Sequence, residues 1–585
     1  MTDTQKDHDV VILGGGLAGQ TLARHLLLET DKTVLIVDRK AELPGRHQKV
    51  GESSVQVAGF YFSKILDMEE YLLREHFMKY NLRFYWRSGG RSNQGFEDYS
   101  HASIRPFSNI ASYQLNRNTF EAELLRRNLE DERFELRAGA HSLEVDLVEE
   151  SAQNHCVRFT VSSEQEEVHC GWVVDTTGRK RALARQLDMR RPTAIQHNAF
   201  FWWVDGLVDI DKLSDLSRRE MRKRPDRAAI GHLPFWMATN HFMDEGMWFW
   251  VIPLQGKTSL GLVYDPAVVP HEEVFSVEKA TRFVCERFPL FARDLPYRKV
   301  LDSGGYRGYA HDCTRTISPS RWAMTGEAGR FSDPLYSPGS DLISFYNTLV
   351  VDAIATDDPE ELQRKCPLFE QIMKAVFQAY IPSYAKSYDV LGDAEAFTLK
   401  YTWELSIYFA YYVFPFINEL VTDRRFAVGF LRLFGKLGPM NQGVQELLSD
   451  FFQWKKEHRG ELAEPAHFDF MEIGTLRQAE RTFYKMTDDP TVAKKILSEQ
   501  LENIEELARF IAAHVAATVV GDDRLRLSQR FVESLDVTDL RFDPEAWKQF
   551  VVQDDEAVYN WSWDPFVMDR FKTGEKAAVA AEVTA

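Results

Sequence analysis

Cysteine is scarce in this chain and follows no pattern. The odd number and the absence of any pair at metal-ligand spacing exclude a disulfide scaffold and predict no metal site. Free thiols are typical of a reducing compartment, so we expect a cytoplasmic protein. The 585 residues contain five cysteines, Cys156, Cys170, Cys285, Cys313 and Cys366.

Long apolar runs and blocks of positive charge are lacking too. The longest nearly unbroken apolar run, Ile407 to Ile417, is too short to cross a bilayer, so we expect no membrane span. The first residues are polar, and we expect no signal peptide. The net charge is −18, and the basic segment Arg218 to Arg227 is interrupted by acids and a proline. These features argue against a nucleic-acid partner.

A glycine-rich turn near the N-terminus carries the first strong signal. The β-branched run Asp9 to Leu13 predicts a strand that leads into the turn Gly14 to Gly19 and then a helix. A second predicted strand, Thr33 to Val37, is followed by Asp38. This order of strand, Gly-x-Gly-x-x-Gly, helix, strand and acid is the dinucleotide-binding fingerprint. We expect the helix N-terminus to face a pyrophosphate and Asp38 to accept from ribose hydroxyls.

The three fingerprint glycines have different expected roles. Gly14 permits the tight turn, Gly16 lets the backbone approach the phosphates, and Gly19 lets the helix pack on the sheet. Each role depends on the missing side chain, so each can be checked against the space around the residue.

Trp248 to Pro253 reads Trp-x-Trp-x-Ile-Pro. Aromatic and β-branched residues closed by a proline predict a strand. Taken alone, this segment fits an aromatic core strand equally well. It lies in a strand-rich stretch with further strands predicted at Asn198 to Val204, His232 to Thr239 and Ser259 to Tyr264.

Four other segments complete the pattern. Gly51-Glu52-Ser53 precedes a predicted helix, and a predicted strand ends in Asp175 and continues to Gly178. Gly326-Glu327 follows a returning strand. The loop Phe331 to Gly339 contains two prolines and precedes a helix predicted from about Asp341.

Together these segments resemble the flavin-dependent halogenases, especially the pyrrole and phenol branch with a long C-terminal helical region. The resemblance covers roughly residues 8–350, and the rest matches only in length and helical character. Trp-x-Trp-x-Ile-Pro and Phe-x-x-Pro-x-x-Ser-x-Gly separate this family from other flavin monooxygenases. It implies FAD-binding residues Gly14, Gly16, Leu17, Ala18, Gly19, Asp38, Gly51, Glu52, Ser53, Arg117, Asp175, Gly178, Gly326, Glu327, Phe331 and Pro334.

The predicted fold is α/β. A Rossmann-like FAD-binding domain of the glutathione-reductase type contains an inserted mixed β-sheet domain and is followed by an all-helical region. We place the FAD-binding domain at 8–190 and 301–355, the inserted substrate domain at 191–300 and the helical domain at 356–572. Residues 573–585 are rich in Ala, Glu and Val and predict a disordered tail.

The resemblance also implies a reaction. A separate flavin reductase, acting transiently or by diffusion, supplies reduced FAD, and oxygen then allows chloride or bromide to be oxidised to hypohalous acid. Lys79 matches the family lysine that directs this oxidant at an electron-rich aromatic carbon, either as an ammonium donor or as an amine that forms a haloamine. The substrate is a small pyrrole or phenol, free or tethered to a carrier protein.

The Trp-x-Trp-x-Ile-Pro strand looks like the family's partition between flavin and substrate. Trp248, Trp250, Ile252 and Pro253 would keep an organic substrate off the flavin while a small oxidant passes. The family holds its halide in the loop represented here by Ser337, Pro338 and Gly339.

Two residues depart from the family. Tyr336 stands where the tryptophan-type enzymes carry a glutamate, which favours the pyrrole and phenol branch and removes a general base. Pro338 has no N–H, so one halide donor is missing. Two alternatives therefore stay open: a flavin monooxygenase that kept the scaffold without halogenating, and a flavin-binding protein without turnover whose C-terminal helices bind a partner.

Aromatic side chains are dense in the C-terminal region. They are candidates for a lid over the substrate pocket, but at helical spacing such rings are more often core. The candidates are Tyr401, Trp403, Tyr408, Tyr411, Tyr412, Trp454, Trp561 and Trp563.

Overall fold

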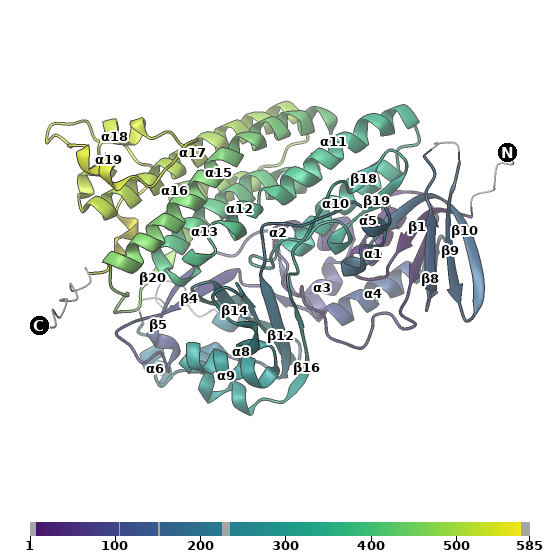
Figure 1. Cartoon of the computed structure of the whole chain (residues 1–585), viewed down its shortest axis with the longest axis horizontal. Helices are drawn as coiled ribbons and strands as arrows, with labels where there is room; N and C mark the ends of the chain where they lie inside the picture. Colours follow the sequence, from purple (N-terminus) through teal and green to yellow (C-terminus); the bar gives the residue numbers. More distant parts are fainter. Residues whose placement is uncertain (1–6, 105, 150–152, 225–233, 575–585) are drawn as a thin grey trace, which may run out of the picture.

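A mostly parallel sheet follows directly from the N-terminal fingerprint (Figure 1). The computed structural model describes residues 7–104, 106–149, 153–224 and 234–574. The strands β1 (His8–Leu13), β2 (Val34–Asp38), β7 (Phe134–Ala138), β10 (Glu164–Asp175) and β19 (Trp322–Met324) pair in parallel in the order β19-β10-β1-β2-β7. Three antiparallel strands extend it, β8 (His141–Asp146), β9 (His155–Val161) and β18 (Ile317–Ser318).

A second, mixed sheet carries the aromatic strand. Its order is β16-β12-β15-β14-β13-β4-β5-β20, and β13–β4 and β5–β20 are its parallel pairs. Its strands are β4 (Leu82–Arg87), β5 (Tyr99–Ser103), β12 (Asn198–Asp205), β13 (Thr239–Asp244), β14 (Met247–Leu254), β15 (Lys257–Tyr264), β16 (Val300–Tyr306) and β20 (His467–Asp469). Two strand pairs lie outside both sheets, β3 (Phe77–Met78) with β6 (Tyr113–Gln114) and β11 (Arg190–Arg191) with β17 (Asp312–Cys313).

The helices before residue 356 cover these sheets. Helix α1 packs on α4 and α10, and Asn347 in the middle of α10 donates to the Ala18 carbonyl oxygen and to Thr21 Oγ1 of α1. They are α1 (Leu17–Glu29), α2 (Gln56–Phe60), α3 (Glu69–Glu75), α4 (Arg117–Leu129), α5 (Ala182–Gln186), α6 (Arg218–Met221), α8 (His271–Val274), α9 (Val277–Arg287) and α10 (Pro338–Ile354).

Long C-terminal helices lie side by side over the second sheet (Figure 1). No helix in the described part of the chain is both long and apolar enough to cross a membrane. The helices are α11 (Pro359–Gln378), α12 (Ile381–Ala385), α13 (Ala394–Tyr408), α14 (Phe414–Ile417), α15 (Arg424–His458), α16 (Gly474–Phe483), α17 (Pro490–Val520), α18 (Gln529–Ser534) and α19 (Pro544–Gln549).

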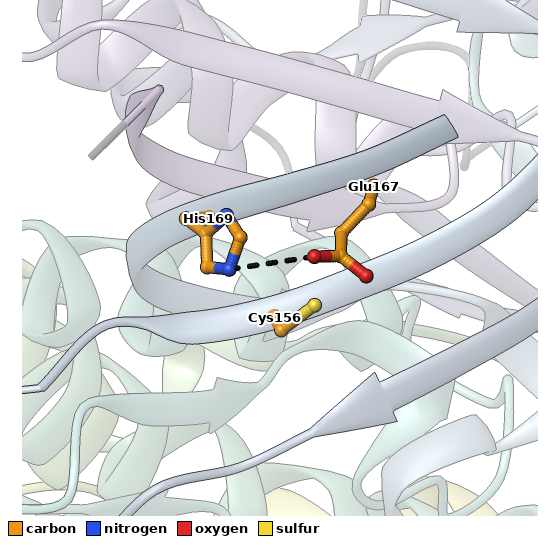
Figure 2. Close-up of side chains that lie close together, drawn as sticks. All are labelled: Cys156, Glu167 and His169. Carbon is orange, nitrogen blue, oxygen red and sulfur yellow. Dashed lines mark ion pairs between the residues drawn. The ribbon is translucent and has the colours of Figure 1, made fainter. Parts of the chain in front are cut away.

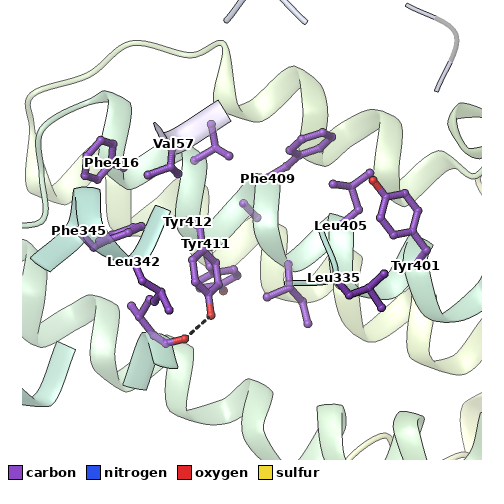
Figure 3. Close-up of a cluster of buried hydrophobic side chains, with 14 of the residues drawn as sticks. Val57, Leu335, Leu342, Phe345, Tyr401, Leu405, Phe409, Tyr411, Tyr412 and Phe416 are labelled. Carbon is purple, nitrogen blue, oxygen red and sulfur yellow. Dashed lines mark hydrogen bonds between the residues drawn. The ribbon is translucent and has the colours of Figure 1, made fainter. Parts of the chain in front are cut away.

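One continuous hydrophobic core joins the C-terminal helices to the mostly parallel sheet and its helices α1 and α10. Figure 3 shows part of it, a cluster in which side chains of α2 and α10 lie among side chains of α13 and α14. The ring centroids of Phe345 on α10 and Phe416 on α14 are 4.9 Å apart. A π-helical turn, Phe409–Val413, separates α13 from α14. Such turns often mark functional sites, and this one lies beside a cavity described below.

Three predictions of local structure are wrong. The predicted strand His232 to Thr239 begins only at Thr239, because Phe235–Met237 form a 3-10 turn, and residues 232 and 233 lie outside the described part. Helix α10 begins at Pro338 rather than near Asp341, since proline suits the first helical position. The predicted helical region contains strand β20, whose long-range pairing with β5 leaves no local signal.

The division into domains stays a prediction. The second sheet draws strands from outside the proposed 191–300 segment, namely β4, β5 and β20. Of the predicted disordered tail, 573–585, all but the first two residues lie outside the described part of the chain.

Candidate functional site

The fingerprint turn has the shape that its glycines predict. Gly14 has φ +108°, and a Cβ there would lie 2.7 Å from the Thr176 carbonyl oxygen. A Cβ at Gly19 would lie 2.1 Å from the Gly14 oxygen, so helix and turn touch there. A Cβ at Gly16 would meet nothing within 4 Å. This open backbone beside a helix N-terminus fits a bound pyrophosphate.

Asp38 lies at the end of β2 and braces the same turn. Its carboxylate accepts from the N–H of Gly15 at 2.6 Å and of Lys40 at 2.7 Å. The side chain is partly exposed, and a carboxylate has more lone pairs than these two bonds use. Its predicted ribose contact therefore remains open to it.

Asp175 and Gly178 shape the neighbouring turn. Asp175 is buried, and its oxygens accept from the Thr177 N–H and hydroxyl and from the Leu183 N–H. These bonds hold Gly178 at φ +58°. Asp175 thus acts on the turn itself, and its buried carboxylate lines neither cavity described next.

Two cavities flank the predicted site. The first, which we call the fingerprint cavity, has a volume of about 160 Å³. The second, the lysine cavity, has a volume of about 300 Å³ and contains Lys79. Predicted residues that line the fingerprint cavity are Leu17, Gly51, Glu52, Ser53, Arg117, Trp248, Trp250, Ile252, Gly326, Glu327, Phe331, Pro334, Ser337 and Gly339.

Residues 336–339, at the start of α10 and just before it, form part of the wall between the cavities. Ser337 and Gly339 line the fingerprint cavity, whereas Tyr336 and Pro338 line the lysine cavity. Tyr336 and Ser337 have φ of +70° and +64°, which side chains rarely adopt. Two successive residues in this conformation are strained, and such strain clusters at functional sites.

Lys79 of the lysine cavity is hydrogen-bonded through this wall to Ser53 of the fingerprint cavity. It is buried, and its Nζ donates to Ser53 Oγ at 2.9 Å and to the Ser54 carbonyl oxygen at 2.7 Å. Burial lowers the pKa of Lys79 to about 7. An ammonium with three N–H donors and two protein acceptors keeps one donor for a ligand in the lysine cavity.

Glu52 lines the fingerprint cavity and is fixed by two hydrogen bonds. Its carboxylate accepts from Trp203 Nε1 at 2.8 Å, and its backbone oxygen accepts from the Leu115 N–H at 2.6 Å. Burial raises the pKa of Glu52, and it does the same for Glu327. Arg117 bonds the Val50 carbonyl oxygen at 2.7 Å and pairs with Glu121, so it fixes the segment that leads into Gly51.

The two tryptophans lie on one face of β14. Their ring centroids are 5.6 Å apart, and Trp248 Nε1 donates to Tyr388 Oη at 2.8 Å. A Cβ at Gly261 on β15 would lie 2.3 Å from the Trp250 ring, so that glycine makes room for the indole. Both indoles line the fingerprint cavity and neither lines the lysine cavity. Pro253 lines neither cavity and pairs with Thr258.

The N-terminus of α10 offers backbone donors. Because α10 begins at Pro338, the N–H groups of Gly339 and Ser340 belong to its first turn and have no intrahelical partners. Ser340 also lines the fingerprint cavity. The sequence interpretation missed Ser340 because it started the helix three residues too late.

The predicted aromatic lid is divided between cavity and core. Tyr401, Tyr408 and Tyr412 line the lysine cavity. Trp403, Tyr411, Trp561 and Trp563 are buried in the core and line neither cavity. The partly buried Trp454 packs against the core.

One group of side chains in the described residues has ligand atoms close enough for a metal ion (Figure 2). Cys156, Glu167 and His169 meet on the β9–β10 hairpin, with ligand atoms within 4.8 Å of one another. Arg158 already pairs with Glu167 at 2.6 Å. Burial raises the pKa of Cys156, which disfavours the thiolate that metals bind. We assign no metal to this group.

Known proteins give a consistent picture. No family model matches the chain. It is 24% identical over 447 residues to flavin-dependent halogenase chlA of Dictyostelium discoideum, with 72% of each chain covered. It is 25% identical over 357 residues to a 1H-pyrrole-2-carbonyl-(peptidyl-carrier protein) chlorinase of Pseudomonas fluorescens, with 57% of this chain and 72% of the relative covered.

Solved structures share the fold. Halogenase PltM in complex with phloroglucinol and FAD matches 87% of this chain and 97% of its own, with a TM-score of 0.59 and 17% identity. The predicted fold class is therefore confirmed: this is the α/β fold of FAD-dependent halogenases with a C-terminal helical region. The sequence matches confirm the resemblance inferred from the motifs, and the chain is related to the flavin-dependent halogenases.

Proposed function

We propose that this chain is a flavin-dependent halogenase. It uses reduced FAD and oxygen to oxidise chloride or bromide to hypohalous acid, and Lys79 directs that acid at a pyrrole or phenol, free or carrier-bound. One observation carries the proposal most: Lys79 of the lysine cavity bonds Ser53 of the fingerprint cavity through their common wall. A reactive group is thus held beside a second cavity, separate from the flavin motifs.

The residues present fit FAD. Gly16 leaves its backbone open beside the N-terminus of α1, and Asp38 lies at the end of β2. Bound FAD, once reduced, would supply the electrons with which oxygen becomes an oxidant for halide. Ser53, Gly326 and Pro334 would border it in the fingerprint cavity.

The halide is proposed to lie at the N-terminus of α10. The free N–H groups of Gly339 and Ser340 and the positive end of the helix dipole favour an anion there. Pro338 supplies no N–H, but the first helical position is where that loss matters least. Ser337 also lines the fingerprint cavity beside these donors.

The tryptophans are proposed to shield the flavin from organic molecules. Because Trp248 and Trp250 line only the fingerprint cavity, we expect the oxidant to cross the wall at Ser53 and the 336–339 loop. A small acid can pass where an aromatic substrate cannot.

Substrate and partners are proposed from relatives. One relative is named a carrier-protein pyrrole chlorinase, and PltM is described with phloroglucinol. The sequence shows no nicotinamide motif, so we propose that a separate reductase supplies reduced FAD by diffusion. Free cysteines fit a reducing compartment, and we propose the cytoplasm.

A direct assay tests this function. Purified protein is supplied with reduced FAD, oxygen and bromide, and with a panel of phenols, pyrroles and a monochlorodimedone-like acceptor. We expect bromide-dependent brominated product by mass spectrometry. Hydroxylated product without halide would favour the monooxygenase alternative, to which the missing Pro338 donor points, and no product over the panel would contradict both.

A glycine pair tests the FAD site. At Gly16 an alanine fits the observed φ of −81° and meets no neighbour, so Gly16→Ala should leave apoprotein stability unchanged. Its methyl group would occupy the phosphate approach and weaken FAD binding at least about tenfold, or about 1.4 kcal/mol. Gly19→Ala should instead lower the melting temperature of the apoprotein. Fluorescence titration with FAD and thermal unfolding separate the two effects, and unchanged FAD affinity in Gly16→Ala would place the pyrophosphate elsewhere.

A third glycine, Gly339, tests the halide site. In Gly339→Ala the new Cβ would lie 3.7 Å from the Phe331 ring, so the fold should persist. The methyl group would crowd the N-terminus of α10, and we expect the KM for bromide to rise about tenfold, close to the worth of one hydrogen bond to an ion. Steady-state kinetics at saturating substrate measure it. Equal KM values for both proteins would move the halide away from this helix.

A further inference from the structure

The lysine cavity contains a carboxyl group for which the motifs gave no role. Asp341 is the fourth residue of α10 and lines the cavity together with Lys79. It is buried, with its side chain fixed from two elements. One oxygen accepts from the Ala58 N–H at 2.8 Å, and the other accepts from Tyr408 Oη at 2.7 Å.

Asp341 and Lys79 face one cavity without pairing directly. Within the described residues no ion pair joins them, although each shifts the titration of the other. Each oxygen of Asp341 accepts one bond and so keeps a lone pair, and Lys79 keeps one N–H. A donor and an acceptor are therefore available to one ligand in the same cavity.

We propose that Asp341 accepts the hydroxyl proton of a phenolic substrate in the lysine cavity. The inference rests on the proposed halogenase function and narrows its substrate class to hydroxylated aromatics. It also supplies the base that Tyr336 removes relative to the tryptophan-type pattern. A pyrrole gains less from this carboxylate, because its N–H is a much weaker acid than a phenol O–H.

The step balances with hypohalous acid as the oxidant. The phenol proton moves to Asp341, and the phenolate ring carbon forms a bond to the halogen. The halogen–oxygen bond breaks, and its electron pair leaves with hydroxide. The ring proton combines with that hydroxide to give water, and Asp341 returns its proton to the product. Phenol and hypohalous acid thus become halophenol and water.

The cavity permits this proton transfer near neutral pH. Burial raises the pKa of Asp341 to about 7, while Tyr408, the Ala58 N–H and Lys79 oppose that rise. The tyrosines that face it are Tyr380 from the α11–α12 connection, Tyr408 from α13 and Tyr412 from the π-helical turn. Burial raises the pKa of each tyrosine well above its usual value, so all three stay neutral.

Two groups that line the lysine cavity therefore titrate around neutrality, Asp341 and Lys79. The rate on a phenol should rise with pH as Asp341 ionises and fall as Lys79 loses its proton, giving a narrow maximum near pH 7.

The experiment compares Asp341→Asn with Asp352→Asn in the full-length protein. Asp352 lies on the same helix, pairs with Lys365 at 2.9 Å and lines neither cavity. We measure kcat/KM against pH for a phenol and for a pyrrole, and separately the hypohalous acid trapped by monochlorodimedone without aromatic substrate. Asp341→Asn should lose about 10²-fold in kcat/KM on the phenol and lose the acidic limb of its pH profile. Trapped hypohalous acid should be unchanged, and Asp352→Asn should match the wild type.

Tyr408→Phe provides a second readout if Asp341→Asn folds poorly. Loss of the Tyr408 hydrogen bond should raise the pKa of Asp341 and move the acidic limb to higher pH. An unaltered acidic limb in both variants, or equal losses on phenol and pyrrole, would overturn the role of Asp341 alone. If the wild type formed neither trapped hypohalous acid nor halogenated product, the proposed function itself would fall.

Discussion

Replacing Lys79 by alanine is expected to lower the rate of aromatic halogenation by about 10²–10⁴-fold, the usual contribution of a positioned acid or base. The free N–H of Lys79 is the donor that could polarise hypohalous acid inside the lysine cavity. Without it, the acid reaches the cavity but is not activated or directed. Halide oxidation should continue, since it depends on the fingerprint cavity, and trapped hypohalous acid should stay near the wild-type level.

The pH profile separates the two possible roles of this lysine. Because burial lowers the pKa of Lys79 to about 7, both its forms are present near neutrality. The test uses a pyrrole, which gains little from Asp341, so that the ionisation of Asp341 adds no rising limb. We expect the ammonium to be the active form, so that activity on the pyrrole falls as pH rises through 7. An amine that forms a haloamine would show the reverse, with activity rising over the same range.

Two further variants serve as controls for Lys79→Ala. Lys64→Ala removes a lysine that pairs with Glu69 at the surface, and its halogenation should be unchanged. Lys79→Arg keeps the charge but not the compact ammonium, and should recover little activity. Full halogenation by Lys79→Ala would mean that the oxidant reacts without direction from this residue.

The fold could be predicted largely because its signals are local. The three fingerprint glycines lie within one short segment of the sequence. The structure shows the tight turn at Gly14, the open backbone at Gly16 and the close packing at Gly19. The alternation of Trp248, Trp250 and Ile252 likewise placed them on one face of a strand. Fold class follows from such segments because their order specifies the parallel sheet.

The cavities could not be predicted, because they arise from residues far apart in the chain. Lys79 meets Ser53 across the wall, while Tyr408 reaches Asp341 from α13, 67 residues later. No local pattern reports such contacts. The identity of Asp341 as a cavity residue depends on where α10 begins, which the sequence placed three residues late.

A buried cluster between C-terminal helices holds the wall of the lysine cavity in place. Glu395 near the start of α13 accepts from Lys455 Nζ of α15 at 2.7 Å and from His514 Nε2 of α17 at 2.7 Å. Burial raises the pKa of Glu395, but Lys455 and His514 outweigh it and hold the pKa at about 2. The carboxylate therefore joins three helices.

Glu395→Gln should destabilise this region by about 3 kcal/mol, because breaking a buried ion pair leaves an uncompensated charge. Lys455 keeps Asp393 as a partner at 2.8 Å, which puts the expected cost at the low end for such a change. Amide hydrogen exchange of α13, α15 and α17 measures it locally. Glu446→Gln, at an exposed pair with Lys386, should cost less than about 1 kcal/mol.

The effect should depend on pH with a definite sign. Since the pKa of Glu395 is depressed on folding, its contribution is complete above the ordinary glutamate pKa of about 4.5 and is lost as pH falls toward 2. The difference in stability between wild type and Glu395→Gln should therefore shrink over that range.

The same variant should also affect the lysine cavity. Because α13 carries Tyr401 and Tyr408 into that cavity, Glu395→Gln should show a higher KM for the aromatic substrate with unchanged formation of hypohalous acid. An unaltered KM together with faster exchange in all three helices would show that the cavity keeps its shape without this cluster.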